Sequence, residues 1–152
     1  MTHMQYQWLS AVPWESVLTL NHALCQAKQL NSEHNGKTFD AARQLWERAV
    51  PSEMTLQEAL DLCRQCSGLS PFVFNNGNTF AAICRTLLEE TLKTMPPVEA
   101  QIIRTTAAHY VNGLVGKKEL TQVLKHFESA WLKARELDGP VSSGDTPRQA
   151  AN

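Results

Sequence analysis

Residues 79–95, TFAAICRTLLEETLKTM, give the clearest indication of the fold. Its apolar side chains recur at steps of three and four residues, and its charged side chains fall between them. This spacing is typical of an amphipathic helix that buries one face. The apolar stripe consists of Phe80, Ile83, Cys84, Leu87, Leu88, Leu92 and Met95, whereas Arg85, Glu89, Glu90 and Lys93 occupy the other side. A helix with so long an apolar stripe needs other apolar faces to pack against it.

The same periodicity continues on both sides of this stretch. It predicts further helices at about residues 13–34, 38–50, 55–68, 97–114 and 117–138. Thr55 and Glu58 have the spacing of a capping box, which fixes the start of one helix. We therefore expect an all-α fold, a single orthogonal or bundle-like domain of about six helices over residues 1–138. Residues 139–152 are rich in Gly, Pro, Ser and Asp, and we expect them to form a disordered tail.

Composition limits the function to a few classes. The chain has 152 residues, of which 43% are hydrophobic, and a formal net charge of -1. This charge offers no overall attraction to polyanions, so nucleic acid is not the expected partner. No apolar run reaches the roughly 18 residues of a membrane-spanning helix, and the N-terminus lacks the pattern of a secretory signal. We expect a cytoplasmic protein whose four cysteines are reduced.

Aromatic residues that lie outside the predicted helices or near a helix end are the candidate partner-binding residues. Trp8 precedes the first predicted helix, Trp131 lies near the end of the last one, and Phe72 and Phe74 lie in a short apolar segment between helices. Tryptophan is enriched at protein interfaces because it buries a large area and keeps one polar atom to pair. The alternative is that the N-terminal segment folds back over the domain and that the two phenylalanines fill the core.

The segment that follows is the candidate small-ligand site. Asn75, Asn76, Asn78 and Thr79 precede the helix of residues 79–95, and Asn78 or Thr79 is placed to cap it. Free amides in a first helical turn hold phosphate or carboxylate groups, and asparagine side chains add directional hydrogen bonds. The alternative, which we favour, is that Asn and Gly are there because a tight turn and an N-cap require them.

Two pairs of metal-ligating residues have the same spacing. His22 and Cys25 lie one turn apart on the first predicted helix, and Cys63 and Cys66 lie one turn apart on the third. Facing each other, they would offer three sulfur atoms and one nitrogen atom, a tetrahedral set that suits zinc. The commoner explanation is packing, because free cysteine behaves as a small hydrophobe on an apolar stripe.

The last two predicted helices, joined by a turn with Gly113 and Gly116, have the layout of a helix-turn-helix. In that arrangement Lys117, Lys118, Gln122 and Lys125 would line the face that contacts DNA. However, Glu119 and Glu128 share the helix, so a solvated face is the simpler explanation.

No catalytic motif is found in the sequence, and no cofactor is indicated. We expect a non-catalytic protein that binds a macromolecular partner, most of all a protein, as an adaptor or regulatory module. Self-association through an apolar helix face is a further expectation. The zinc-binding and DNA-binding interpretations are the alternatives.

Overall fold

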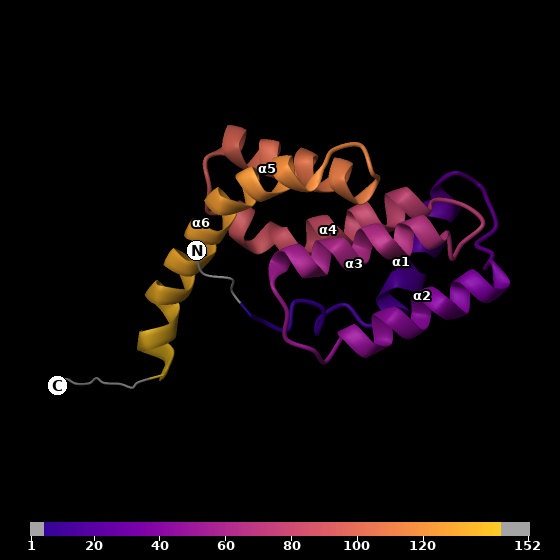
Figure 1. Cartoon of the computed structure of the whole chain (residues 1–152), viewed down its shortest axis with the longest axis horizontal. Helices are drawn as coiled ribbons and strands as arrows, with labels where there is room; N and C mark the ends of the chain where they lie inside the picture. Colours follow the sequence, from indigo (N-terminus) through magenta and orange to yellow (C-terminus); the bar gives the residue numbers. More distant parts are fainter. Residues whose placement is uncertain (1–4, 144–152) are drawn as a thin grey trace.

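The structure, a computed structural model, describes the backbone of residues 5–143 and the side chains of residues 5–136. Six helices follow one another in this part of the chain, and no named strand occurs in it. They are α1 (Trp14–Ala27), α2 (Gly36–Ala49), α3 (Leu56–Leu69), α4 (Asn76–Leu92), α5 (Pro97–Val111) and α6 (Lys117–Ser143). The predicted all-α class is confirmed, and the helices form one compact domain (Figure 1).

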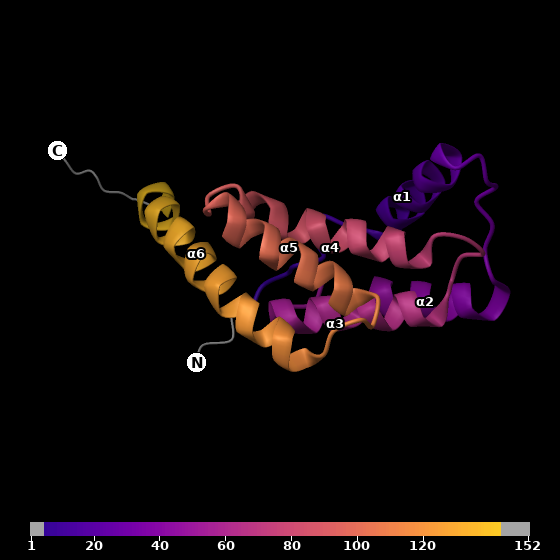
Figure 2. The same ribbon diagram turned by 90° about the horizontal axis from the view of Figure 1, so that it is seen from above.

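Helix α4, which contains most of residues 79–95, contacts α1, α3, α5 and α6. Figures 1 and 2 show α6 at one end of the molecule and α1 and α2 at the other. Most of the apolar stripe of α4 is buried because each neighbour covers part of that stripe. Its buried apolar side chains are Phe80, Ile83, Cys84, Leu88 and Leu92.

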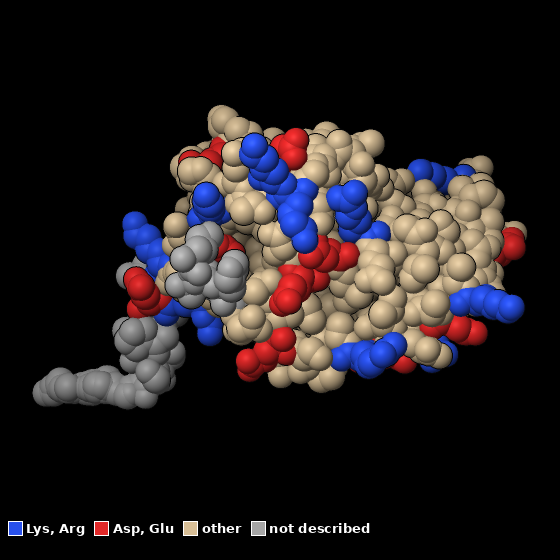
Figure 3. Space-filling model, viewed as in Figure 1, with Lys and Arg blue, Asp and Glu red and all other residues tan. Residues whose placement is uncertain are grey.

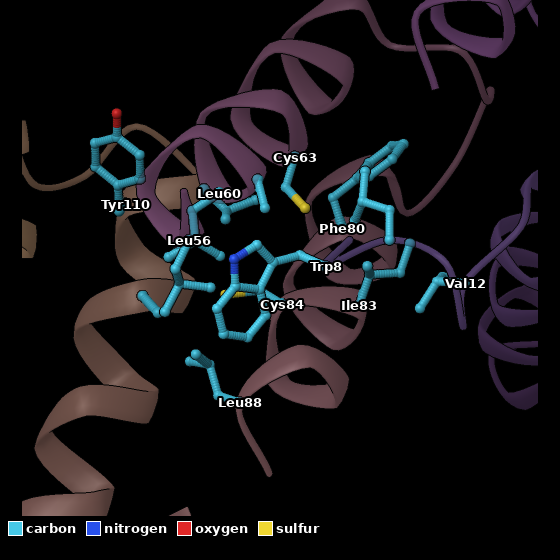
Figure 4. Close-up of a cluster of buried hydrophobic side chains, with 14 of the residues drawn as sticks. Trp8, Val12, Leu56, Leu60, Cys63, Phe80, Ile83, Cys84, Leu88 and Tyr110 are labelled. Carbon is cyan, nitrogen blue, oxygen red and sulfur yellow. The ribbon is translucent and has the colours of Figure 1, made fainter. Parts of the chain in front are cut away.

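The core continues from α4 into the segment that precedes α1. Trp8 and Leu9 are buried, and Figure 4 shows the Trp8 indole among Leu56, Cys84 and Leu88. Towards α1 and α2 the core is aromatic. Its rings belong to Trp14, Phe39, Trp46, Phe72 and Phe80. Burial of large aromatic side chains contributes most of the packing at this end.

The helix boundaries depart from the predicted ones where loop residues adopt unusual backbone angles. Helix α1 ends at Ala27 rather than near residue 34, because Gln29 takes a left-handed conformation with φ of 59°. Helix α4 begins three residues earlier than predicted, after Asn75, whose φ is 66°. Neither Asn78 nor Thr79 is therefore the N-cap, and that prediction is wrong.

The start of α3 agrees with the sequence. The capping box at α3 is confirmed, since Glu58 N donates to Thr55 Oγ1 at 3.1 Å and Thr55 N donates to Glu58 Oε1 at 2.8 Å. Helix α6 continues through Ser143, beyond the expected end at residue 138, and the rest of the predicted tail lies outside the described residues.

None of the described helices combines the length and apolar character needed to cross a membrane.

Candidate functional site

The N-terminal segment folds back over the domain and removes Trp8 from the surface. Tyr6 and Met54 exchange two backbone hydrogen bonds of 3.0 and 2.9 Å, which anchor the segment beside the start of α3. Trp8 is only 6% exposed and packs against Phe127 and Trp131. The structure thus places this predicted partner-binding residue in the core.

Trp131, its predicted companion, is half-buried on α6. The guanidinium of Arg135 lies 4.6 Å from the centre of the Trp131 ring and 5.1 Å from that of Tyr6. Cation–π contacts of this kind cover an aromatic face that a partner would otherwise use. The Trp131 surface is accordingly occupied by the chain itself.

The segment at residues 70–75, between α3 and α4, is held by asparagine side chains, and we call it the clamped loop. Asn35 Nδ2 donates to the backbone oxygens of Ser70 and Phe72, at 2.9 and 3.0 Å. Asn76 Nδ2 donates to the Phe72 oxygen at 2.7 Å, and Asn76 Oδ1 accepts from the Phe72 nitrogen at 2.9 Å. These contacts fix the backbone at Phe72, whose own side chain is buried in the aromatic core. Phe72 is a core residue rather than the predicted partner-binding one.

A third asparagine reaches the clamped loop from α1. Asn21 Nδ2 donates to the Phe74 oxygen at 2.8 Å. The neighbouring segment pairs with the loop as well, because Val73 N donates to Glu33 O at 2.9 Å. With its backbone held from both sides, the loop leaves Val73 and Phe74 pointing outward, 41% and 38% exposed. Phe74 is therefore a predicted partner-binding residue that does reach the surface.

The asparagines of the predicted ligand site are engaged with one another and with neighbouring side chains. Asn75 Oδ1 accepts from Lys28 Nζ at 2.8 Å and from Asn78 Nδ2 at 3.3 Å. Asn76 clamps the preceding loop, and Thr79 is buried where it accepts from Asn21 Nδ2 at 3.1 Å. The structure brings these residues together, but their polar groups form hydrogen bonds that hold the start of α4 and the loop before it.

The four residues of the predicted zinc site do not come together. His22 is exposed, with Nδ1 2.8 Å from Ser32 Oγ, whereas Cys25 is buried on the same helix. Cys63 and Cys66 are buried in α3. Throughout the described residues, no group of three or more His, Cys, Asp or Glu side chains is placed to hold a metal ion. The zinc alternative thus lacks an assembled site in the described structure.

The buried thiols of α3 and α4 are held in the protonated form. Burial raises the pKa of Cys66 and of Cys84 to about 12, and burial together with the neighbouring Cys84 and Cys66 thiols raises the pKa of Cys63 well above its ordinary value. Because the thiolate is the reactive form, thiols of this kind are unreactive towards oxidants and metals. Their role in the fold is packing.

The predicted DNA-contacting helix is partly tied to the domain. Lys117 Nζ lies 3.6 Å from Asp61 Oδ2 of α3, and all four predicted DNA-contacting side chains remain exposed: Lys117, Lys118, Gln122 and Lys125. In Figures 1 and 2, α5 and α6 lie alongside each other and run in opposite directions. Figure 3 shows Lys and Arg side chains next to a band of Asp and Glu rather than in a continuous basic surface. Such a mixed surface gives little electrostatic support to phosphate binding.

A polar cluster that the sequence analysis did not identify joins α3, α5 and the start of α6. Tyr110 Oη donates to Asp61 Oδ1 at 2.5 Å, and Arg64 lies 4.7 Å above the Tyr110 ring. Burial, followed by the hydrogen bond to Asp61, raises the pKa of Tyr110. Asp61 and Tyr110 are 49 positions apart, so no local pattern links them.

The clamped loop combines exposed apolar side chains with a backbone that is fixed by side-chain hydrogen bonds. A search for relatives finds no matching family model, no matching curated protein and no matching solved structure. The function therefore has to be inferred from the chain's own residues.

Proposed function

We propose that this chain is a protein-binding module, an adaptor or regulatory protein, and that its docking surface is centred on the clamped loop. The observation that carries the proposal is the display of Val73 and Phe74 on a backbone held by Asn21, Asn35 and Asn76. Ordering a loop on binding costs free energy, and a loop that is already ordered avoids that cost. Exposed apolar side chains on a rigid scaffold are the usual anchors of a protein interface.

Two further features of the same end of the molecule support the proposal. Leu30 is exposed in the segment that pairs with the clamped loop. In addition, Gln29, Ser70 and Asn75 all have positive φ although none is glycine. Such conformations cost about 1 to 3 kcal/mol each and are concentrated at functional sites.

The four cysteines of the chain are all free, which fits the reducing cytoplasm that we propose as the location of the protein.

The test is site-specific crosslinking from the proposed surface. A photoreactive phenylalanine analogue at position 74 should form a covalent adduct with a protein partner in cell extract, and the same analogue at the exposed position 114 should not. The captured protein should then bind the purified wild-type chain and lose at least about tenfold in affinity with Phe74→Ser. Leu114→Ser, a matched loss of an exposed apolar side chain, should leave affinity unchanged.

Phe74→Ser should stay folded with a cooperative thermal transition, because the Phe74 side chain is 38% exposed and only its backbone oxygen takes part in the clamp. A partner that binds Phe74→Ser and the wild-type chain equally well would refute the proposed surface.

A further inference from the structure

The outer face of α5 carries two strongly exposed apolar side chains. Val98 is 75% exposed and Ile102, one turn later, is 53% exposed. With Pro97, Gln101 and Thr105 they line a shallow depression of about 510 Å³. None of these five side chains carries a charge. Exposed apolar side chains grouped on one helix face are the kind of surface that a protein contact buries.

Charged residues of both signs border this face on one side. Arg85, Glu89, Glu90 and Arg104 line a hollow between α4 and α5, about 650 Å³ in volume, which shares Gln101 with the apolar depression. The two Arg and two Glu side chains balance in charge. An apolar centre with a polar rim is the usual anatomy of a protein interface.

The pairing within this rim is incomplete. Arg104 and Glu89 form an ion pair at 3.3 Å, and Glu90 lies 3.3 Å from Lys93 with both side chains largely exposed. Arg85 forms no ion pair with any other described residue. Arg85 and Glu90, which lie five residues apart on α4, thus give the border of the patch one unpaired cation and one weakly paired anion.

We propose that the α5 face binds a second copy of this chain, through a two-fold axis close to Ile102. In such an isologous contact the same patch serves both subunits, so a surface must complement itself. An uncharged apolar face satisfies this requirement, because Val98 and Ile102 of one subunit can bury against the same residues of the other. The balanced rim satisfies it too, since the rotation brings Arg85 of one copy towards Glu90 of its partner.

Charge balance favours a second copy over a different protein as the occupant. A strongly acidic or basic partner would meet like charges on half of this rim, which opposes association. The two α5 helices would run antiparallel across the axis, so that the positive N-terminal end of each dipole lies near the negative C-terminal end of the other. The apolar face is small compared with the roughly 800 Å² per partner of a standard interface, and the dimer is therefore a weak one.

Sedimentation equilibrium of the full chain, from micromolar to near-millimolar concentration, tests this proposal. The expected result is a reversible monomer–dimer equilibrium whose dissociation constant rises at least about tenfold with Ile102→Asp. Leu114→Asp introduces the same charge at another exposed apolar residue and should leave the equilibrium unchanged. A chain that is monomeric throughout the range, or a dimer that is indifferent to Ile102→Asp, would overturn the proposal.

A charge exchange tests the two-fold register. Arg85→Glu and Glu90→Arg should each weaken the dimer, and the double variant should restore it, because opposite charges then face each other again. Failure of the double variant to restore association would overturn this register. Ile102→Asp should still bind the partner captured at the clamped loop, so the failure of either proposal can be recognised separately.

Discussion

Asn21 on α1 and Thr79 on α4 form a buried polar pair, with Asn21 Nδ2 donating to Thr79 Oγ1 at 3.1 Å. Both side chains are almost fully buried, and the other donor contact of the Asn21 amide is the Phe74 oxygen. One side chain thereby joins two helices to the loop that displays Phe74. Buried polar groups that are fully hydrogen-bonded specify one arrangement of the elements around them, since any other arrangement leaves them unpaired.

Replacing Asn21 should therefore destabilise the fold and loosen the clamped loop together. Asn21→Ala leaves the Phe74 oxygen without its side-chain donor and should lower the free energy of unfolding by about 2 to 3 kcal/mol. Urea denaturation measures this loss, and amide hydrogen exchange at residues 70–75 should speed up under native conditions. Asn78→Ala removes only an exposed 3.3 Å contact and should change stability by less than about 0.5 kcal/mol. Equal effects of the two variants would contradict the assignment of Asn21 as the clamp.

The helices were predictable because each carries a local signal. The stripe of α4, the capping box of Thr55 and Glu58, and Pro97 in the first turn of α5 depend on neighbours within one or two turns. The start of α4 was predicted three residues late because it depends on Asn75 adopting a left-handed conformation. Nothing in the adjacent sequence distinguishes that conformation from a simple N-cap at Asn78.

The candidate site was less predictable, because it depends on contacts between distant residues. Asn21 and Asn35 hold the clamped loop from positions 53 and 35 residues away. The spacing of His22, Cys25, Cys63 and Cys66 shows which residues share a helix face, but not whether two helices turn those faces towards each other. Trp8 lies outside any helix, so periodicity could not show that the N-terminal segment folds back over the core.

Two buried tryptophans differ in the pairing of their indole nitrogens. Trp46 Nε1 donates to the Val12 oxygen at 2.8 Å, whereas Trp8 Nε1 has no hydrogen-bond partner among the described residues. Trp46→Phe leaves a buried acceptor unpaired, and Trp8→Phe removes a donor that was already unpaired. Both changes lose similar volume, so Trp46→Phe should be more destabilising by about 1 to 2 kcal/mol in urea denaturation. A larger loss for Trp8→Phe would show that the Trp8 nitrogen is paired after all.

Replacing glycine by alanine should change the free energy of unfolding differently at Gly68 and at Gly77. A Cβ atom at Gly77 would lie 2.1 Å from Asn112 Oδ1, whereas a Cβ at Gly68 meets nothing within 4 Å. Gly68→Ala should stabilise the protein by about 0.5 to 1 kcal/mol, because alanine loses less backbone entropy in a helix. Gly77→Ala should lack that gain, since the Asn112 side chain must move and break its bond to the Ala108 oxygen.

A double-mutant cycle checks this explanation for Gly77. In an Asn112→Ala background the close contact is gone, and Gly77→Ala should then raise the melting temperature as Gly68→Ala does. If Gly77→Ala is already stabilising in the wild-type background, α4 and α5 do not approach each other as closely as the structure shows.

Stability should fall at alkaline pH because of the three buried thiols of α3 and α4. Burial raises the pKa of Cys66 and Cys84 to about 12 and that of Cys63 well above its ordinary value of 9.0. Above pH 9 the unfolded chain therefore releases thiol protons that the folded chain still holds, which favours unfolding. The stabilisation is fully present below pH 9. As the pH rises from 9 towards the folded pKa, the free energy of unfolding falls by about 1.4 kcal/mol per pH unit for each thiol. Tyr110, whose pKa is also raised, adds a loss above pH 10.

Urea denaturation under reducing conditions at a series of pH values between 8 and 11 measures this dependence. Cys84→Ala lowers stability at every pH because it leaves a cavity, but it should also remove the contribution of one thiol to the slope. The curves of the variant and the wild type should accordingly converge as the pH rises above 9. Parallel curves would mean that Cys84 loses its proton equally readily in the folded and unfolded chains, and that its thiol is open to solvent rather than packed between α3 and α4.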